Sequence, residues 1–291
     1  MLTLPRLPDS ISFDAAALLE PLSVAIHAVN RAQPTPGSTA LVIGAGAVGL
    51  LTAAMARQSG CSTVTIADVD QGRVDFAIAK GFATHGFVVP RPLHTSSSCS
   101  SIYSGSPSSS GTSTPLDGVM TPASALSMQS QFDYAKSLAG EMLALTAPSP
   151  SSQFVDDMND EDDGVDVTFE CTGKEVCMHT SLYATRAGGK VIMVGMGTPV
   201  QTLPVSVAHL REIDILGIFR YANTYATGIR LLCARERAAK APAGGGWVLP
   251  SLDEMVTHRF KGLENAHRAF ELASRTVDAE GRLVLKVVIE A

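Results

Sequence analysis

The sequence has few cysteines, and they form no pattern typical of a structural site. Its 291 residues include five cysteines, an odd number, and no two of them are separated by only two residues. A disulfide framework requires paired cysteines, and a structural zinc site requires closely spaced ligands. The pattern argues against both and indicates free thiols.

The N-terminus has no secretory signal pattern. Residues 1–10 contain two prolines and an aspartate, without an apolar run that leads to a small-residue cleavage site. Residues 32–56 carry no charge, but this stretch holds four glycines and changes from strand-like to helix-like spacing, which disfavours a membrane span. We therefore expect a cytoplasmic protein without a membrane partner.

The chain also has no excess of basic residues. Its net charge of −6 equals the charge of the six acidic residues within 156–163, so the remainder is balanced. Binding to nucleic acid usually requires a basic patch or stripe. No nucleic-acid partner is expected.

Short apolar strands alternate with helical stretches over much of the chain. This βαβαβ alternation, which recurs after an interruption, predicts an α/β fold with a Rossmann-type doubly wound parallel sheet. The expected strands are 39–43, 63–67, 86–89, 165–169, 190–194 and 213–218. The expected helices between them are 47–58, 70–80, 174–186 and a short one near 204–211.

Two segments interrupt this alternation. Fourteen of the residues in 95–115 are Ser or Thr, a composition that buries too little apolar surface to offset chain entropy. Disordered insertions are expected at 92–130 and 147–163, on either side of a helix at Gln131 to Leu145. An expected turn at Gly188-Gly189 precedes the strand at 190–194.

Further elements are expected at both ends of the chain. Residues Ser12 to Val29 have helical spacing, with Ser12 as the N-cap and a kink at Pro21. Near the C-terminus, the expected elements are helices near 223–235 and 263–275, a flexible linker from Ala241 to Gly246 and a strand at 283–289.

A glycine-rich turn follows the first expected strand. In Gly44-Ala45-Gly46-Ala47-Val48-Gly49, Gly44 permits the tight turn, Gly46 allows the main chain to approach a pyrophosphate, and Gly49 allows the helix to pack closely on the strand. The start of the helix offers N–H donors to phosphate. The order of strand, glycines and helix predicts dinucleotide binding, and a purely structural turn is the alternative.

Asp68 ends the second expected strand, nineteen residues after Gly49. A carboxylate there can accept hydrogen bonds from both adenosine ribose hydroxyls and would repel a 2'-phosphate, which favours NAD over NADP. The alternatives are a strand-end cap for Asp68 and a solvated helix position for nearby Arg73.

Three stretches closely resemble zinc-dependent medium-chain polyol dehydrogenases, the family of sorbitol, xylitol and arabinitol dehydrogenases. The resemblance covers residues 8–90 and 165–235 well and extends loosely to the C-terminal strand. The stretches are Leu18-Leu19-Glu20-Pro21-Leu22-Ser23-Val24-Ala25-Ile26-His27, Phe169-Glu170-Cys171-Thr172-Gly173 and Gly217-Ile218-Phe219-Arg220-Tyr221.

The resemblance implies roles for particular residues. Glu20 would lie beside the catalytic zinc, and Arg220 and Tyr221 would reach a polyol substrate. Alternatively, Glu20 is solvated, Tyr221 packs, and Val194 and Ile218 are core residues. Arg220 is expected to be buried with a partner. The residues implied to bind NAD are Gly44, Gly46, Ala47, Val48, Gly49, Asp68, Arg73, Cys171, Thr172, Val194, Gly195, Met196, Ile218, Phe219 and Arg220.

The resemblance also implies a domain division. Residues 1–30 would be a linking helix, 31–235 the NAD-binding domain and 236–291 the C-terminal part of a GroES-like catalytic domain. Relatives have an N-terminal GroES-like segment that supplies the zinc ligands, and this chain is expected to lack most of it. Five histidines occur singly and are assigned to no metal, so NAD is the expected cofactor and zinc is in doubt. They are His27, His179, His209, His258 and His267.

Two functions remain open from the sequence. The first is an NAD-dependent oxidoreductase that converts a secondary alcohol of a polyol to a ketone by hydride transfer, and the second is a non-catalytic NAD-binding protein. Another alcohol substrate, such as threonine, is a third possibility. A homo-oligomer is expected through the apolar segment Ile213 to Phe219, and exposed apolar surface is expected on 1–29 and 247–291.

Overall fold

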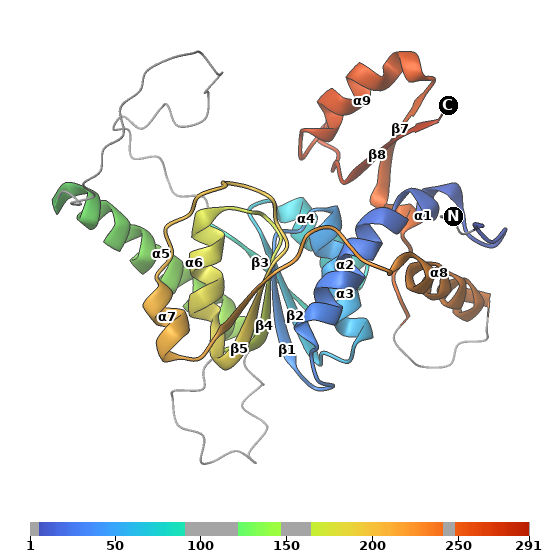
Figure 1. Cartoon of the computed structure of the whole chain (residues 1–291). Helices are drawn as coiled ribbons and strands as arrows, with labels where there is room; N and C mark the ends of the chain where they lie inside the picture. The colour runs from blue at the N-terminus through green and yellow to red at the C-terminus, as the bar shows by residue number, and fades with distance from the viewer. Residues whose placement is uncertain (1–5, 91–121, 147–163, 241–247, 291) are drawn as a thin grey trace.

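The computed structural model describes residues 6–90, 122–146, 164–240 and 248–290. Its largest element is a six-stranded parallel sheet in the order β3-β2-β1-β4-β5-β6 (Figure 1). This strand order confirms the expected doubly wound sheet. The strands are β1 Thr39–Ile43, β2 Thr63–Asp68, β3 His85–Val88, β4 Val165–Glu170, β5 Thr185–Met193 and β6 Asp214–Gly217.

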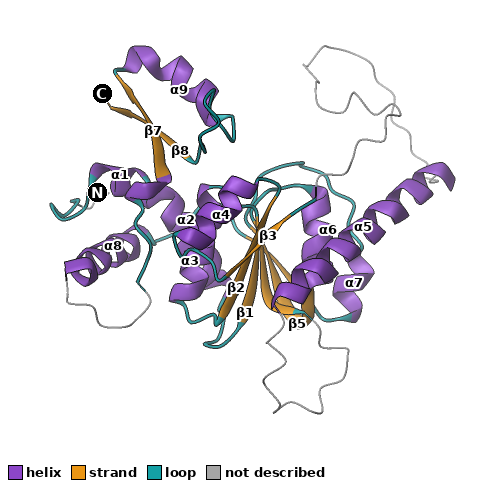
Figure 2. Cartoon of the chain, turned by 180° about the vertical axis from the view of Figure 1, so that it is seen from behind, coloured by secondary structure: helices purple, strands orange, loops and turns teal. Residues whose placement is uncertain are grey.

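Helices cover both faces of this sheet, as both views show (Figures 1 and 2). One face carries α2 Leu19–Ala32, α3 Ala47–Gln58 and α4 Gln71–Ala79. The other carries α5 Pro122–Thr146, α6 Glu175–Ala184 and α7 Val205–Leu210. Parallel strands covered on both faces are apolar along their whole length, and Leu41, Val42 and Phe169 in the central strands are accordingly inaccessible to solvent.

Asp166 ties the central strands together at their starts. Its carboxylate accepts hydrogen bonds from the Thr39 N–H (2.7 Å) and hydroxyl (2.8 Å) and from Arg186 Nε (2.9 Å). Burial alone would raise the pKa of Asp166, but these hydrogen bonds outweigh it and lower the pKa. One carboxylate thus joins β1, β4 and β5.

The N-terminal helix differs from the expectation of one helix kinked at Pro21. Ser12 caps α1 (Phe13–Ala17) by accepting the Ala15 N–H, as predicted, but the chain breaks at Leu18 before α2. Pro21 lies in the first turn of α2, where its missing N–H would have no intrahelical partner. The proline therefore starts a helix and does not bend one.

Two other boundaries differ from expectation. The Gly188-Gly189 pair lies within β5, where the β4–β5 register shifts and Gly188 has φ +68°. Helix α5 begins at Pro122, so residues 122–130 are helical and not part of the expected insertion. The rest of both expected insertions and the linker from Ala241 to Gly246 lie outside the described residues.

The C-terminal part forms a smaller unit after α8 (Tyr225–Lys240) and η2 (Asp253–Met255). Strand β7 (Val256–Lys261) pairs in parallel with β8 (Lys286–Glu290), and η3 (Leu263–Asn265) and α9 (Ala266–Ala273) lie between them in sequence. Figure 2 shows this pair apart from the large sheet. The sequence reading missed β7. Within the described ranges, no helix is long and apolar enough to span a membrane.

Candidate dinucleotide-binding site

A cavity of about 500 Å³ opens at the carboxyl ends of β1, β2 and β4. These ends form the topological switch point, because the connections after β1 and β4 leave toward opposite faces of the sheet. Ligands of doubly wound sheets bind at such a point. The cavity walls include the glycine-rich loop, Asp68, Arg73, Cys171 and Thr172, all predicted from the sequence, together with Tyr134, Leu138 and Met142 of α5.

The three glycines of the loop have different surroundings. Gly44 has φ +104° and donates its N–H to Ala67 O at 2.7 Å, which extends the β1–β2 pairing to the start of the turn. A Cβ on Gly49 would lie 1.8 Å from Gly44 O, so α3 packs as closely as predicted. A Cβ on Gly46 would meet only Arg73 Nη1, at 4.0 Å. Gly46 therefore leaves open space at the cavity, and Ala47 and Val48 begin α3 beside it.

Asp68 accepts two backbone hydrogen bonds, one of them from the glycine loop. Its Oδ2 accepts the Ala45 N–H at 2.6 Å, and its Oδ1 accepts the Asp70 N–H at 3.0 Å. Each carboxylate oxygen has a second lone pair. Asp68 therefore caps the end of its strand, as the alternative expected, and the same carboxylate lines the cavity.

Arg73 is partly buried beside the loop, which does not match the alternative of a solvated helix residue. Its Nη2 lies 3.5 Å from Val284 O, and its Nε is buried with no hydrogen-bond partner in the described part of the chain. Buried polar groups are normally paired. The guanidinium Nη1 beside Gly46 is a cationic N–H donor that suits an anionic group such as a pyrophosphate.

Glu170, at the end of β4, is a site residue whose role the sequence reading missed. Only 2% of it is exposed, and its carboxylate accepts hydrogen bonds from Thr172 N (2.8 Å), the Thr172 hydroxyl and Gly173 N (2.9 Å). An acidic residue that ends an otherwise apolar strand was the signal available in the sequence. Glu170 shapes the loop that carries Cys171 and Thr172.

Cys171 lines the cavity as a neutral side chain. Its thiol pKa is raised mainly by burial and further by the charge of Glu170. A thiol acts as a nucleophile or metal ligand in its thiolate form. Cys171 therefore contributes shape to the cavity and not reactivity.

The loops after β4 and β5 cross in close contact. Val194 N and Gly195 N both donate to Glu170 O at 2.8 Å. A Cβ on Gly195 would lie 2.1 Å from Gly173 N, and one on Gly197 would lie 2.0 Å from Gly173 O. Val194 and Gly195 are therefore fixed beside Thr172, and the next side chain, Met196, is 82% exposed.

The residues after β6 are more exposed than expected. Ile218 donates its N–H to Met193 O at 3.2 Å and is partly buried against the core, but Phe219 is 73% exposed. The expectation of a buried Arg220 is wrong: it is exposed, has φ +54° and places its guanidinium 5.4 Å from the Phe219 ring centroid. β6 is the edge strand of the described sheet, so the chain leaving it is not covered.

Glu20 lies exposed in the first turn of α2, close enough to Tyr225 to act on it. The Tyr221 and Tyr225 hydroxyls share a hydrogen bond of 3.4 Å, and the two ring centroids are 5.1 Å apart. This hydrogen bond is the main cause that raises the pKa of Tyr225 to about 12, and burial, Tyr221 and the charge of Glu20 add to it. The packing alternative for Tyr221 thus matches its contacts.

The described residues do not fit a zinc site. They include no group of three His, Cys, Asp or Glu side chains that could hold a metal ion. Catalytic zinc normally has about three protein ligands. Glu20 alone does not meet this requirement.

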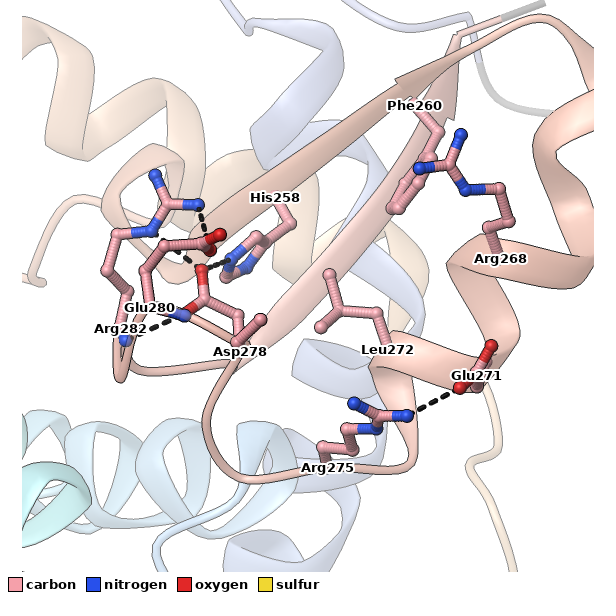
Figure 3. Close-up of a pocket in the computed structure, with 10 residues that line it drawn as sticks. His258, Phe260, Arg268, Glu271, Leu272, Arg275, Asp278, Glu280 and Arg282 are labelled. Carbon is pink, nitrogen blue, oxygen red and sulfur yellow. Dashed lines mark hydrogen bonds and ion pairs between the residues drawn. The ribbon is translucent and has the colours of Figure 1, made fainter.

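A second cavity, of about 330 Å³, lies between β7, α9 and the loop before β8 (Figure 3). Asp278 accepts hydrogen bonds from His258 Nε2 (3.1 Å) and Arg282 Nε (2.6 Å), which hold its pKa well below the usual value although burial acts in the other direction. Arg275 pairs with Glu271 at 2.5 Å. Asp278, Arg282, Arg275 and Glu271 are thus paired with one another or with His258 and are not free to bind a ligand.

Comparisons with known proteins show which proteins this chain is similar to. A family model described as "Zinc-binding dehydrogenase" matches residues 123–234. Solved structures of similar fold include L-idonate 5-dehydrogenase from Escherichia coli (TM-score 0.63, 18% identity, covering 98% of this chain and 59% of that one). Another is zinc-dependent alcohol dehydrogenase 2 from Streptococcus pneumonia (TM-score 0.65, 20% identity, 99% and 61%). At these identities the likeness shows the fold.

The sequence relatives include sorbitol dehydrogenases. Sorbitol dehydrogenase of Mus musculus is 31% identical over 285 residues, which are 98% of this chain and 58% of that protein. Sorbitol dehydrogenase of Gallus gallus is 30% identical over 270 residues, 93% and 56% respectively. The predicted resemblance to the zinc-dependent polyol dehydrogenases is confirmed. The chain spans somewhat more than half the length of these relatives.

Proposed function

We propose that the protein binds NAD at the carboxyl edge of the six-stranded sheet and takes part in the oxidation of a secondary alcohol of a polyol. The observation that carries the proposal is the cavity at the switch point, which is lined by the open Gly46, by Arg73, whose Nη1 lies beside Gly46, and by Asp68. These groups suit a pyrophosphate flanked by a ribose. A carboxylate at the ribose favours NAD over NADP.

Each part of the cofactor has residues suited to it. The Gly44–Gly49 loop and Arg73 would hold the pyrophosphate, and Asp68 would bind the adenosine ribose. When bound, NAD would accept the hydride from the alcohol carbon. The residues proposed to border the nicotinamide half are Cys171, Thr172, Val194, Gly195, Met196, Ile218, Phe219 and Arg220. Arg220 and Tyr221 would orient the polyol hydroxyls.

The domain division is also part of the proposal. Residues 31–235 would be the NAD-binding domain, 1–30 a linking helix and 236–291 part of a catalytic domain. The support is that β7 and β8 form a sheet separate from the six-stranded one, whose strands all lie within 31–235. The edge position of β6 and the exposed Phe219 beside it support self-association there.

The second candidate function is NAD binding without turnover. The observation in its favour is that the described residues offer no set of zinc ligands around Glu20. This candidate has the same cofactor site and differs only in the chemistry.

Calorimetric titration with NAD and NADP tests the shared part of both candidates. NAD should bind more tightly than NADP, and Asp68→Ala should weaken NAD binding about 10- to 100-fold because a charged hydrogen-bond acceptor is lost. Asp75→Ala removes the same charge from an exposed position on α4 and should leave binding unchanged. The proposal fails if the wild-type protein binds neither dinucleotide, or if both variants behave alike.

Turnover separates the two candidates. Purified protein is assayed for zinc content and for NAD-dependent oxidation of xylitol and sorbitol, with and without added zinc. Oxidation supports the dehydrogenase, whereas NAD binding with no oxidation under any of these conditions supports the non-catalytic protein.

A further inference from the structure

Two side chains on α6 are hydrogen-bonded to one residue, Thr202, of the loop after β5. Glu175 Oε2 accepts the Thr202 N–H at 3.1 Å, and His179 Nε2 lies 2.6 Å from Thr202 O. Glu175 and His179 are one helical turn apart and therefore face the same way. Together they bind the backbone N–H and the backbone C=O of Thr202.

The hydrogen bonding of His179 is not explained by packing alone. Its side chain is 1% exposed, and its ring contacts Phe132 of α5 edge-on, with centroids 4.8 Å apart. A carbonyl partner requires the proton on Nε2, which leaves Nδ1 as an acceptor, and Nδ1 is buried without a partner in the described part of the chain. A buried unpaired atom is unfavourable. An apolar residue would fill this space without that cost, but it could not bind Thr202.

The loop after β5, residues 194–202, is one of those proposed to border the nicotinamide. It leaves β5 at Val194 and Gly195, which are fixed by Glu170 O, and residues 196–200 are then exposed until Thr202. Between these two anchors, the loop also has bonds of 3.3 Å from Thr198 N and Gln201 Nε2 to Gly173 O. The bonds from Glu175 and His179 are shorter. They therefore set where the far end of the loop lies.

We propose that His179 and Glu175 are positioning residues that hold the loop after β5 in the geometry that receives the nicotinamide half of NAD. The inference rests on the proposed function. In a doubly wound sheet the second half, β4 to β6, receives this part of the dinucleotide, whereas the glycine loop and Asp68 of the first half receive the adenosine and pyrophosphate. Loss of these two hydrogen bonds should therefore weaken binding of the nicotinamide half of NAD and not of the adenosine and pyrophosphate.

The test compares NAD with ADP-ribose, which has the same adenosine and pyrophosphate but no nicotinamide ring. Calorimetry on His179→Leu should show NAD binding weakened about tenfold and ADP-ribose binding changed by less than about twofold. His179→Gln keeps a side-chain N–H donor and should restore most of the loss. Glu175→Ala, at a partly exposed position, removes the other hydrogen bond to Thr202 without opening the core and should act in the same direction.

A matched control is Ser181→Ala on the same helix. Ser181 is fully buried and donates to Cys177 O at 2.7 Å, but it has no bond to the loop after β5. Its loss should leave the ratio of NAD to ADP-ribose affinity unchanged. Hydrogen exchange of the amides in 196–203, measured without ligand, should be faster in His179→Leu and Glu175→Ala and unchanged in Ser181→Ala.

The outcomes separate this inference from the proposed function. Equal weakening of both ligands, or no change in either His179→Leu or Glu175→Ala, overturns the positioning role while NAD binding stands. If the wild-type protein binds ADP-ribose and NAD equally well, the loop makes no use of the nicotinamide and the inference fails. Binding of neither ligand overturns the proposed function, and this inference with it.

Discussion

The six-stranded sheet and the two-stranded C-terminal sheet differ in how much apolar surface they cover. In the first, β1 and β4 lie between helices on both faces, and Phe82 and Phe169 are fully buried. In the unit around the second, Leu263 of η3 and Phe270 of α9 are 70% and 74% exposed, and among the described residues β7 and β8 pair only with each other. Two-stranded sheets are marginally stable at best on their own. The large sheet can sustain a precise site, and the small unit depends on contacts outside itself.

The largest expected effect comes from the glycine loop of the large sheet. Gly49→Ala should reduce the free energy of unfolding by more than about 4 kcal/mol, because its Cβ would lie 1.8 Å from Gly44 O and the backbone must move. Gly46→Ala, with 4.0 Å of room, should keep the stability within about 1 kcal/mol but impair NAD binding. Denaturant unfolding measures the first effect and calorimetry the second. Similar stability of both variants would contradict the close packing of α3 on β1.

A second pair of variants compares the two regions directly. Phe169→Ala should cost about 3–5 kcal/mol of unfolding free energy, because a fully buried ring leaves a cavity. Phe270→Ala should change it by less than about 0.5 kcal/mol, because that ring is already exposed. Urea unfolding of both variants is the measurement. A large loss for Phe270→Ala would mean that this ring is covered in solution.

Acid should lower the unfolding free energy by protonating Asp166, which joins three strands of the large sheet. Its pKa in the folded protein is below the unfolded value of about 4, so its contribution is present above pH 4 and is lost as the pH falls through the folded pKa. The unfolding free energy should therefore decline below about pH 5, and Asp166→Asn should flatten that decline. Chemical unfolding from pH 3 to 7 measures this, and the same slope in the variant would rule the mechanism out.

The smallest effect is expected where the two regions are linked by an exposed ion pair. Lys80 Nζ lies 2.5 Å from Glu254 Oε2, and both side chains are nearly half exposed. Such pairs contribute about 0–1 kcal/mol. Lys80→Ala should shift the unfolding midpoint only slightly, and high salt should have a similar effect on the wild-type protein. A shift as large as that of Phe169→Ala would show that the contact between the regions controls stability.

The elements of the large sheet were predictable because their pattern is local. Strands such as Ala40 to Ile43 are short apolar runs, and the glycine loop follows directly in sequence. Strand β7 was missed because Thr257, His258 and Arg259 interrupt its apolar residues, so no run identifies it. Its pairing with β8 depends on contacts that are distant in sequence.

Side-chain roles were less predictable than backbone elements. Asp68 was found because its spacing from the glycines has a known purpose, and Arg73 because of the family resemblance; both line the cavity. Glu170 and His179 were not, because their partners are backbone atoms whose positions only the folded chain defines. The apolar residues before Arg220 led to the expectation that it is buried. Those residues do not reveal the strand order, which places β6 at the edge of the described sheet.

The pairing of β1 with β4 has a consequence for how the chain folds during synthesis. The bond from Thr39 to Asp166 joins residues 127 apart, and the two strands are adjacent at the centre of the sheet. At about 5–20 residues per second, a ribosome would need roughly 6–25 s to make the chain between them. During that time β1 can pair with β2 but not with β4. The backbone of Leu41, Val42 and Ile43 is then unpaired on the side where β4 will later bind. A nascent chain in this state is one that chaperones would be expected to bind.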